Sequence, residues 1–159
     1  MLLRLLTLSR FNRLKTAETG KAMIKLVDHD PNWSGVAEML MSALAREFGH
    51  CFTRLDHVGS TAVPGLAAKP KLHIDVILKH GIRPEALRDR LLAVGYTDHG
   101  YRFRQDEIQM TRATAHLSTP AIDTLSGGIV SHRLCLCRPD CLAAADRRRF
   151  RDALCRDAA

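Results

Sequence analysis

The clearest pattern of apolar and polar residues lies between residues 33 and 48, where apolar side chains recur every three or four positions. This spacing predicts an amphipathic helix, because residues three and four apart share one helix face. Asp30 is a suitable N-cap, Pro31 suits the first helical position, and Gly49 ends the run. Weaker patterns of the same kind predict two more helices, over residues 84–94 and 140–155.

Short apolar runs between these helices predict strands. The order of the elements indicates an α/β or α+β fold, in which helices pack on a mixed sheet. Residues 96–104 and 107–115 resemble two polar strands of a hairpin, whereas residues 118–128 are rich in turn residues and predict a weakly structured insertion. The predicted strands cover residues 24–27, 52–58, 72–78, 96–104, 107–115 and 129–137.

The composition indicates one folded domain that follows a basic leader. The chain has 159 residues, and 46% of them are hydrophobic, which is enough for a core and too many for a disordered chain. Residues 1–22 carry five basic residues and one acidic residue, a net +4 of the chain's +7, so residues 23–159 carry +3. We expect a flexible leader over 1–22 and a single domain over 23–159. The mild positive charge suits a phosphorylated ligand better than a nucleic acid.

Five cysteines and no evident signal peptide indicate reduced thiols in a cytoplasmic protein. No apolar run approaches the roughly 20 residues that a membrane helix needs. Cys135 and Cys137 share one face of a predicted strand, and His132 lies nearby. Their spacing fits no common zinc motif, and strand alternation turns His132 away from both thiols, so we expect no metal to bind to these three.

The stretch GSTAVPGLAAKP, residues 59–70, connects two predicted strands and has the composition of a ligand-binding loop. Gly59 allows a ligand to approach the backbone closely, and Ser60 offers a hydroxyl beside backbone N–H groups. Lys69 supplies a positive charge within the loop. We therefore expect Gly59, Ser60, Thr61 and Lys69 to contact phosphate.

On the strand that follows, His73 and Asp75 are two residues apart and should share one face. A carboxylate between Ile74 and Val76 is unfavourable unless a partner binds it, which favours a site role for Asp75. His73 beside it can act as a ligand or as a catalytic base. A metal bound there beside a phosphate loop would suit phosphoryl chemistry. Arg133 lies on a later strand, and a guanidinium suits phosphate.

Each of these residues also has a purely structural interpretation. Gly59 and Ser60 can form a plain turn, Asp75 can be a salt-bridged acid, and His73 can be a half-buried, hydrogen-bonded imidazole. Arg102 and Arg104 also lie on strands that could face the site, but single arginines are usually solvated. The run Arg147–Arg151 is predicted to be an exposed helix face.

Three segments together resemble the GrpB family, also called UPF0157, of the nucleotidyltransferase superfamily. They are HVGSTAVPGLAAKP (57–70), SHRLCLCRPD (131–140) and RRRFRDAL (147–154). The resemblance runs from about residue 23 to residue 154 and implies a nucleotidyltransferase-like mixed sheet. Val58, Gly59 and Ser60 match the opening of the superfamily pattern, and Asp75 matches its second carboxylate.

The resemblance implies a metal-dependent nucleotidyl transfer to an acceptor that the sequence does not identify. Asp75 would hold Mg²⁺ or Mn²⁺, and the loop with Lys69 would hold the phosphates of a nucleoside triphosphate. Two positions depart from the pattern. His73 replaces the first carboxylate, and imidazole is a poor ligand for Mg²⁺. Cys135 ends a segment where the family often has His-His-Leu-His.

These departures leave the presence of enzymatic activity open. The alternative is a catalytically degenerate relative that binds a phosphorylated ligand or a protein partner. Asp106 and Glu107 are the candidates for a third carboxylate. Nucleic-acid binding ranks last, since the sequence lacks interleaved stacking aromatics.

Overall fold

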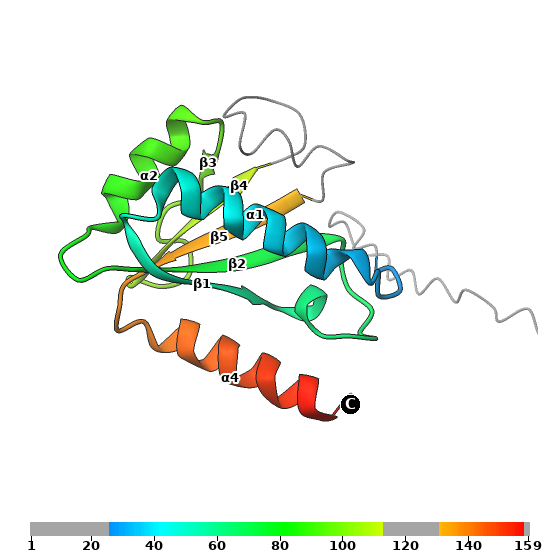
Figure 1. Ribbon diagram of the computed structural model, residues 1–159. Coiled ribbons are helices and arrows are strands. Elements are labelled where there is room, and N and C mark those ends of the chain that lie inside the picture. The colour runs from blue at the N-terminus through cyan, green and yellow to red at the C-terminus, as the bar shows by residue number, and fades with distance from the viewer. Residues whose placement is uncertain (1–25, 113–130, 158–159) are drawn as a thin grey trace, which may run out of the picture.

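The computed structural model describes residues 26–112 and 131–157, which fold into a five-stranded mixed sheet between two layers of helices (Figure 1). Helices α1 and α2 cover one face of the sheet, and α4 lies against the other. The sequence-based expectation of a mixed sheet with packed helices is confirmed. The helices are α1 (Asn32–Phe48), α2 (Pro84–Ala93) and α4 (Leu142–Asp157), with a short 3₁₀ turn η1 (Ser60–Ala62).

The strand order across the sheet is β1-β2-β5-β4-β3. Strands β2 and β5 are parallel at the centre, and the other neighbouring pairs are antiparallel. The central pair therefore places two segments about 60 residues apart in direct register, with Asp75 opposite Cys135. The strands are β1 (Phe52–Val58), β2 (Lys71–Leu78), β3 (Thr97–Asp98), β4 (Glu107–Arg112) and β5 (Ser131–Cys137).

The two faces of the sheet differ in chemistry because successive strand residues point to opposite sides. On the side of α1 and α2, Leu72, Ile74 and Val76 join the main apolar core, as the alternation in the sequence predicts. On the side of α4, the same strands present polar side chains and thiols. One row on that side crosses four strands and contains Asp56, Asp75, Cys135 and Gln109.

Helix α1 lies where the sequence predicts it, but its two capping positions differ from the prediction. Its N-cap position is Pro31, while Asp30 lies one residue earlier and accepts a hydrogen bond from the Asn32 N–H at 2.9 Å. Gly49 follows the helix with a φ of −58°, so it continues the right-handed conformation rather than forming a left-handed cap.

Of the predicted strands, 96–104 is shorter than expected, and 24–27 and 107–115 are described only in part. Of the segment 24–27, only Val27 pairs, through an isolated bridge to Ala68, and residues 24–25 lie outside the described residues. Segment 96–104 contributes only β3. Segment 107–115 contributes β4, and residues 113–115 lie outside the described residues. The predicted hairpin pairing is confirmed, since β3 and β4 are antiparallel neighbours, and β4 is almost fully buried although it carries polar residues. Ile108 and Met110 face the core, and Arg112 lies over the Tyr96 ring on the same side. Glu107 points to the opposite side, where it pairs with Arg147 of α4.

The leader 1–22 and the insertion 118–128 lie outside the described residues, so both expectations stay predictions. Among the described helices, none is sufficiently long and apolar to span a bilayer.

Candidate functional site

A pocket of about 340 Å³ opens where the loop after β1 meets the start of β2 and β5. The residues expected to bind phosphate are brought together here: Gly59, Ser60, Thr61, Lys69 and Arg133 all line it. We call this the loop pocket. Its other lining residues are Leu26, Val58, Ala67, Ala68, Lys71, Leu72 and His73.

Glycine is required where the chain leaves β1. Gly59 has a φ of 79° and a ψ of −175°, a conformation that residues with a Cβ rarely adopt. This bend turns the chain from β1 into η1. Gly65 also has a positive φ, 76°, in the turn that the Leu66 N–H closes on the Val63 carbonyl at 3.3 Å.

Thr61 and its partner His57 brace the loop. The His57 ring nitrogen Nε2 lies 3.0 Å from the Thr61 hydroxyl, and Thr61 is buried. Burial, together with the charge of Arg151, lowers the pKa of His57 from 6.5 to about 4, so this imidazole is neutral at pH 7. Arg151 of α4 donates to the backbone carbonyl of His57 at 2.8 Å.

Three cationic side chains line the loop pocket, and none of its described lining residues is acidic. Burial and the nearby charges of Arg133 and Lys69 lower the pKa of Lys71. Arg133 has a buried Nε without a hydrogen-bond partner among the described residues. The cations therefore repel one another, and an anion bound between them would relieve that repulsion.

Asp75 does not line the loop pocket. Its carboxylate is fully buried beneath α4, where Arg147 donates from Nε to Oδ2 at 2.8 Å. Another nitrogen of Arg147 donates to Oε2 of buried Glu107 at 2.7 Å. Burial raises the pKa of Asp75 to about 6, although the hydrogen bond and charge of Arg147 oppose that rise.

The prediction of an exposed arginine face on α4 is therefore wrong for two of its members. Arg147 and Arg151 reach back to the sheet, whereas Arg149 is exposed, with 77% of its side chain accessible. A charge run in a sequence does not show which arginines lie on the inner face of a helix. The buried carboxylates of Asp75 and Glu107 hold Arg147, and the backbone carbonyl of His57 holds Arg151.

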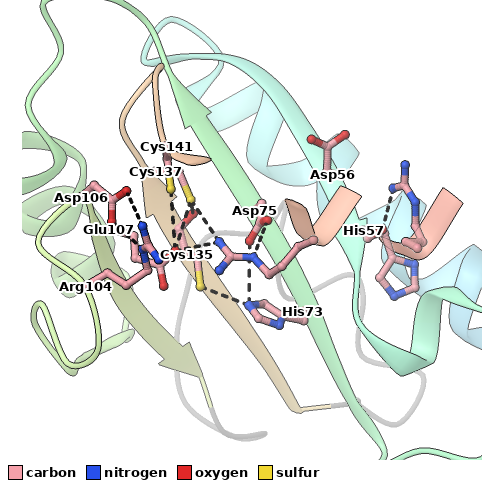
Figure 2. A network of polar contacts seen from close by, with 12 residues as sticks. Asp56, His57, His73, Asp75, Arg104, Asp106, Glu107, Cys135, Cys137 and Cys141 are labelled. Carbon is pink, nitrogen blue, oxygen red and sulfur yellow. Dashed lines mark hydrogen bonds and ion pairs between the residues drawn. The ribbon is translucent and has the colours of Figure 1, made fainter. Parts of the chain in front are cut away.

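His73, Asp75 and Cys135 converge on the α4 side of the sheet (Figure 2). His73 Nε2 lies 3.1 Å from Cys135 Sγ and 3.8 Å from Asp75 Oδ1. The prediction that His73 and Asp75 share a face is confirmed, while the contribution of Cys135 was missed. His132 points the other way, as expected, and its ring meets the Tyr96 hydroxyl at 2.7 Å.

The thiol of Cys135 is unsuited to nucleophilic chemistry. Cys135 is fully buried, and this burial raises its thiol pKa far above the ordinary range. The imidazole of the neighbouring His73 is neutral as well, since burial and nearby cations lower its pKa to about 3. The pair is therefore not an activated cysteine.

Of the two candidates for a third carboxylate, Glu107 lies on the site face and shares Arg147 with Asp75. Asp106 instead pairs with Arg104, and Arg104 and Arg102 stay exposed and outside the loop pocket.

These donors do not fit Mg²⁺. One oxygen of Asp75 accepts from Arg147, and the nearest ligand atoms to its other oxygen are an imidazole nitrogen and a thiol sulfur. Mg²⁺ requires several oxygen donors in an octahedral arrangement. The metal predicted for Asp75 from the resemblance is therefore not the one that this arrangement favours.

Comparison with known proteins identifies relatives of the chain. Residues 23–159 match the model of the GrpB protein family. A UPF0157 protein of Halalkalibacterium halodurans is 33% identical over 76 residues, which cover 48% of this chain and 39% of that protein. A dephospho-CoA kinase of Mycolicibacterium paratuberculosis is 36% identical over 88 residues, which cover 54% of this chain and 22% of the kinase.

The match thus spans about a fifth to two fifths of the length of these relatives. Among solved structures, the conserved protein GrpB from Enterococcus faecalis has the same fold, with a TM-score of 0.67 at 20% identity. The superposition covers 84% of this chain and 74% of that one. The family match extends over most of the sequence and includes the loop pocket and the strands below it. The chain therefore belongs to the GrpB family.

Proposed function

We propose that this protein binds a phosphorylated ligand of the nucleotide class in the loop pocket. The observation that carries the proposal is the group of three cations, Lys69, Lys71 and Arg133, in a pocket whose described lining includes no acid. Charge-assisted hydrogen bonds from such groups to phosphate are roughly twice as strong as neutral ones. The apolar residues beside them supply a surface for the rest of the ligand.

The volume of the loop pocket supports a small ligand rather than a polymer. About 340 Å³ lies at the lower end of the range for small-molecule sites. Part of a dephospho-CoA kinase resembles this chain, and dephospho-CoA is itself a nucleotide with a diphosphate. Since the match covers 22% of the kinase, we take from it a compound to test rather than an activity.

Nucleotidyl transfer with Mg²⁺ or Mn²⁺ is the second candidate function, and one observation favours it. His73 lines the loop pocket, and Asp75 lies two residues further along the same strand face. For this function Asp75 would have to leave Arg147 and turn toward the ligand. We therefore rank phosphate binding without transfer above it.

Calorimetric titration of the full chain with ATP, CTP, GTP, UTP, dephospho-CoA and pyrophosphate tests both candidates. Each ligand is titrated in EDTA, in Mg²⁺ and in Mn²⁺. We expect binding that persists in EDTA and that Arg133→Gln weakens by about ten- to a hundredfold, the usual effect of losing a hydrogen bond to a charged group. Arg149→Gln removes the same charge at an exposed position and should leave affinity within about twofold.

Two results would change the assignment. Binding that requires Mg²⁺ and is abolished by Asp75→Asn would favour the transferase. Equal losses of affinity in Arg133→Gln and Arg149→Gln would mean that the ligand does not bind in the loop pocket.

A further inference from the structure

We propose that His73, Asp75 and Cys135 form a binding site for zinc or a similar transition-metal ion. Their ligand atoms lie within 4.8 Å of one another, and all three side chains come from the adjacent parallel strands β2 and β5. We call these three residues the His-Asp-Cys cluster. It differs from the magnesium site expected from the sequence in its ligands and in the metal that it favours.

The spacing of the donor atoms is close to what a tetrahedral ion needs. Zinc binds nitrogen, oxygen and sulfur at about 2.0–2.3 Å, which places tetrahedral donors about 3.3–3.6 Å apart. Nε2 of His73 lies 3.1 Å from the sulfur and 3.8 Å from the carboxylate oxygen. Small side-chain movements would therefore bring the three atoms into a coordination sphere.

An independent observation points to a ligand at the same place. Asp75 is 0% exposed, yet its Oδ1 has no hydrogen-bond partner among the described residues. A buried carboxylate oxygen without a partner is costly. This orphaned oxygen is the atom that lies near His73 Nε2, so a cation between the two would satisfy it.

The surroundings support a metal in both charge and geometry. Arg147 binds the other oxygen of Asp75, which orients the carboxylate as an outer partner of a metal ligand does. With Zn²⁺ bound and the Cys135 thiol proton released to solvent, the ion and Arg147 would carry three positive charges. Asp75, Cys135 and Glu107 would carry three negative charges, so the buried group would be neutral overall.

The donor types decide which metal fits. A thiolate, an imidazole and one carboxylate oxygen favour zinc and similar ions over Mg²⁺ or Ca²⁺. Three protein ligands leave the fourth position for water or for an oxygen of a bound ligand. His73 also lines the loop pocket, so the proposed metal site and the pocket share a residue.

A second group, Glu107, Cys137 and Cys141, has similar spacing but carries no proposal. Its carboxylate oxygen Oε2 already accepts from Arg147 at 2.7 Å, and the thiols of Cys137 and Cys141 donate to the same oxygen at 3.9 and 4.0 Å. A metal there would have to displace Arg147. This second group therefore supplies a matched control for the first.

Titration of the metal-free full chain with Co²⁺ and Zn²⁺, without nucleotide, tests the proposal. Co²⁺ reports thiolate ligands through a charge-transfer absorption, and a chelator competition gives the Zn²⁺ affinity. We expect one ion per chain with a thiolate band that Cys135→Ser removes. Asp75→Asn and His73→Gln should weaken binding by more than about tenfold, since losing an outer partner alone costs about 10- to 100-fold.

Cys141→Ser should retain the band and the affinity. If Cys135→Ser fails to fold, His73→Gln decides the matter, because 24% of this side chain is accessible. The proposal is overturned if no thiolate band appears, or if Cys141→Ser removes it while the three cluster variants keep it. Nucleotide is absent throughout, so this result is independent of the test of phosphate binding.

Discussion

Replacing Arg147 by Met should destabilise the protein severely although the residue lies on a partly exposed helix. The change keeps most of the apolar stem and removes the guanidinium that pairs with Asp75 at 2.8 Å and Glu107 at 2.7 Å. The side chains of these acids are 0% and 3% exposed. Removing one partner of a buried ion pair costs about 3–5 kcal/mol, because the remaining charge is left without compensation.

Protonation of Asp75 sets a limit on this cost and makes it depend on pH. Neutralising a carboxyl with a pKa of 3.8 costs about 4 kcal/mol at pH 7 and about 2 kcal/mol at pH 5, at 1.36 kcal/mol per pH unit. Burial already raises the pKa of Asp75 to about 6 in the native protein, and losing Arg147 raises it further. The folded variant binds this proton more tightly than the unfolded chain, so its stability falls as pH rises.

The assay is urea unfolding in EDTA at pH 5 and pH 7, with Arg149→Met as the control. Arg149 is 77% exposed and pairs with an equally exposed Asp146, so its loss should cost less than about 1 kcal/mol. We expect a large cost for Arg147→Met at pH 7 and a smaller one at pH 5. A cost equal to that of Arg149→Met at pH 7, or one that grows toward pH 5, would refute the ion-pair arrangement.

Three further changes test the structure around the loop pocket, and a fourth, Gly35→Ala, serves as a control. The pKa of His57 falls from 6.5 to about 4 on folding, so its contribution to stability is present above pH 6.5 and lost as pH falls. His57→Gln should therefore reduce the change in the free energy of unfolding between pH 6.5 and pH 4 by up to about 3 kcal/mol. Gly59→Ala should lower the free energy of unfolding by about 1–3 kcal/mol in a thermal unfolding assay, because φ is 79°. Gly35→Ala in α1 should instead stabilise the protein by up to about 1 kcal/mol, because no atom lies within 4 Å of the added Cβ. Ile74→Ala should cost about 2–5 kcal/mol in urea unfolding, since Ile74 is fully buried in the core, and a cost below about 1 kcal/mol would contradict its placement.

Much of the fold follows from local patterns. The helical spacing over 33–48 and the alternation over 72–78 depend on which face of one element is apolar, and α1 and β2 lie where these patterns indicate. The sequence also predicts that Gly59 and Lys69 lie close together, because both belong to one short loop, and both line the loop pocket. The pairing of the polar hairpin agrees with its prediction, but the burial of β4 does not follow from the sequence, since alternating polar residues indicate solvent unless another element lies over that face, as Arg147 of α4 does over Glu107.

The α4 side of the sheet could not be predicted from spacing. Asp75 meets Cys135 through parallel pairing of strands that are far apart in the sequence, and it meets Arg147 through the packing of the last helix. Such contacts depend on strand order and helix placement, which no short motif encodes. A buried carboxylate in an apolar strand did indicate that a partner must exist, and the arginine-rich segment 147–151 contained that partner.

The proton affinity of Lys71 gives the most direct test of the claim that the loop pocket holds cations for an anion. The measurement is an NMR titration of the lysine side chains, with and without saturating pyrophosphate. We expect the pKa of Lys71 to lie below the ordinary lysine value in the protein without ligand, because burial, Arg133 and Lys69 lower it, and we expect pyrophosphate to raise it. A pKa of Lys71 at the ordinary value, unchanged by pyrophosphate, would show that the loop pocket does not hold clustered cations for an anion.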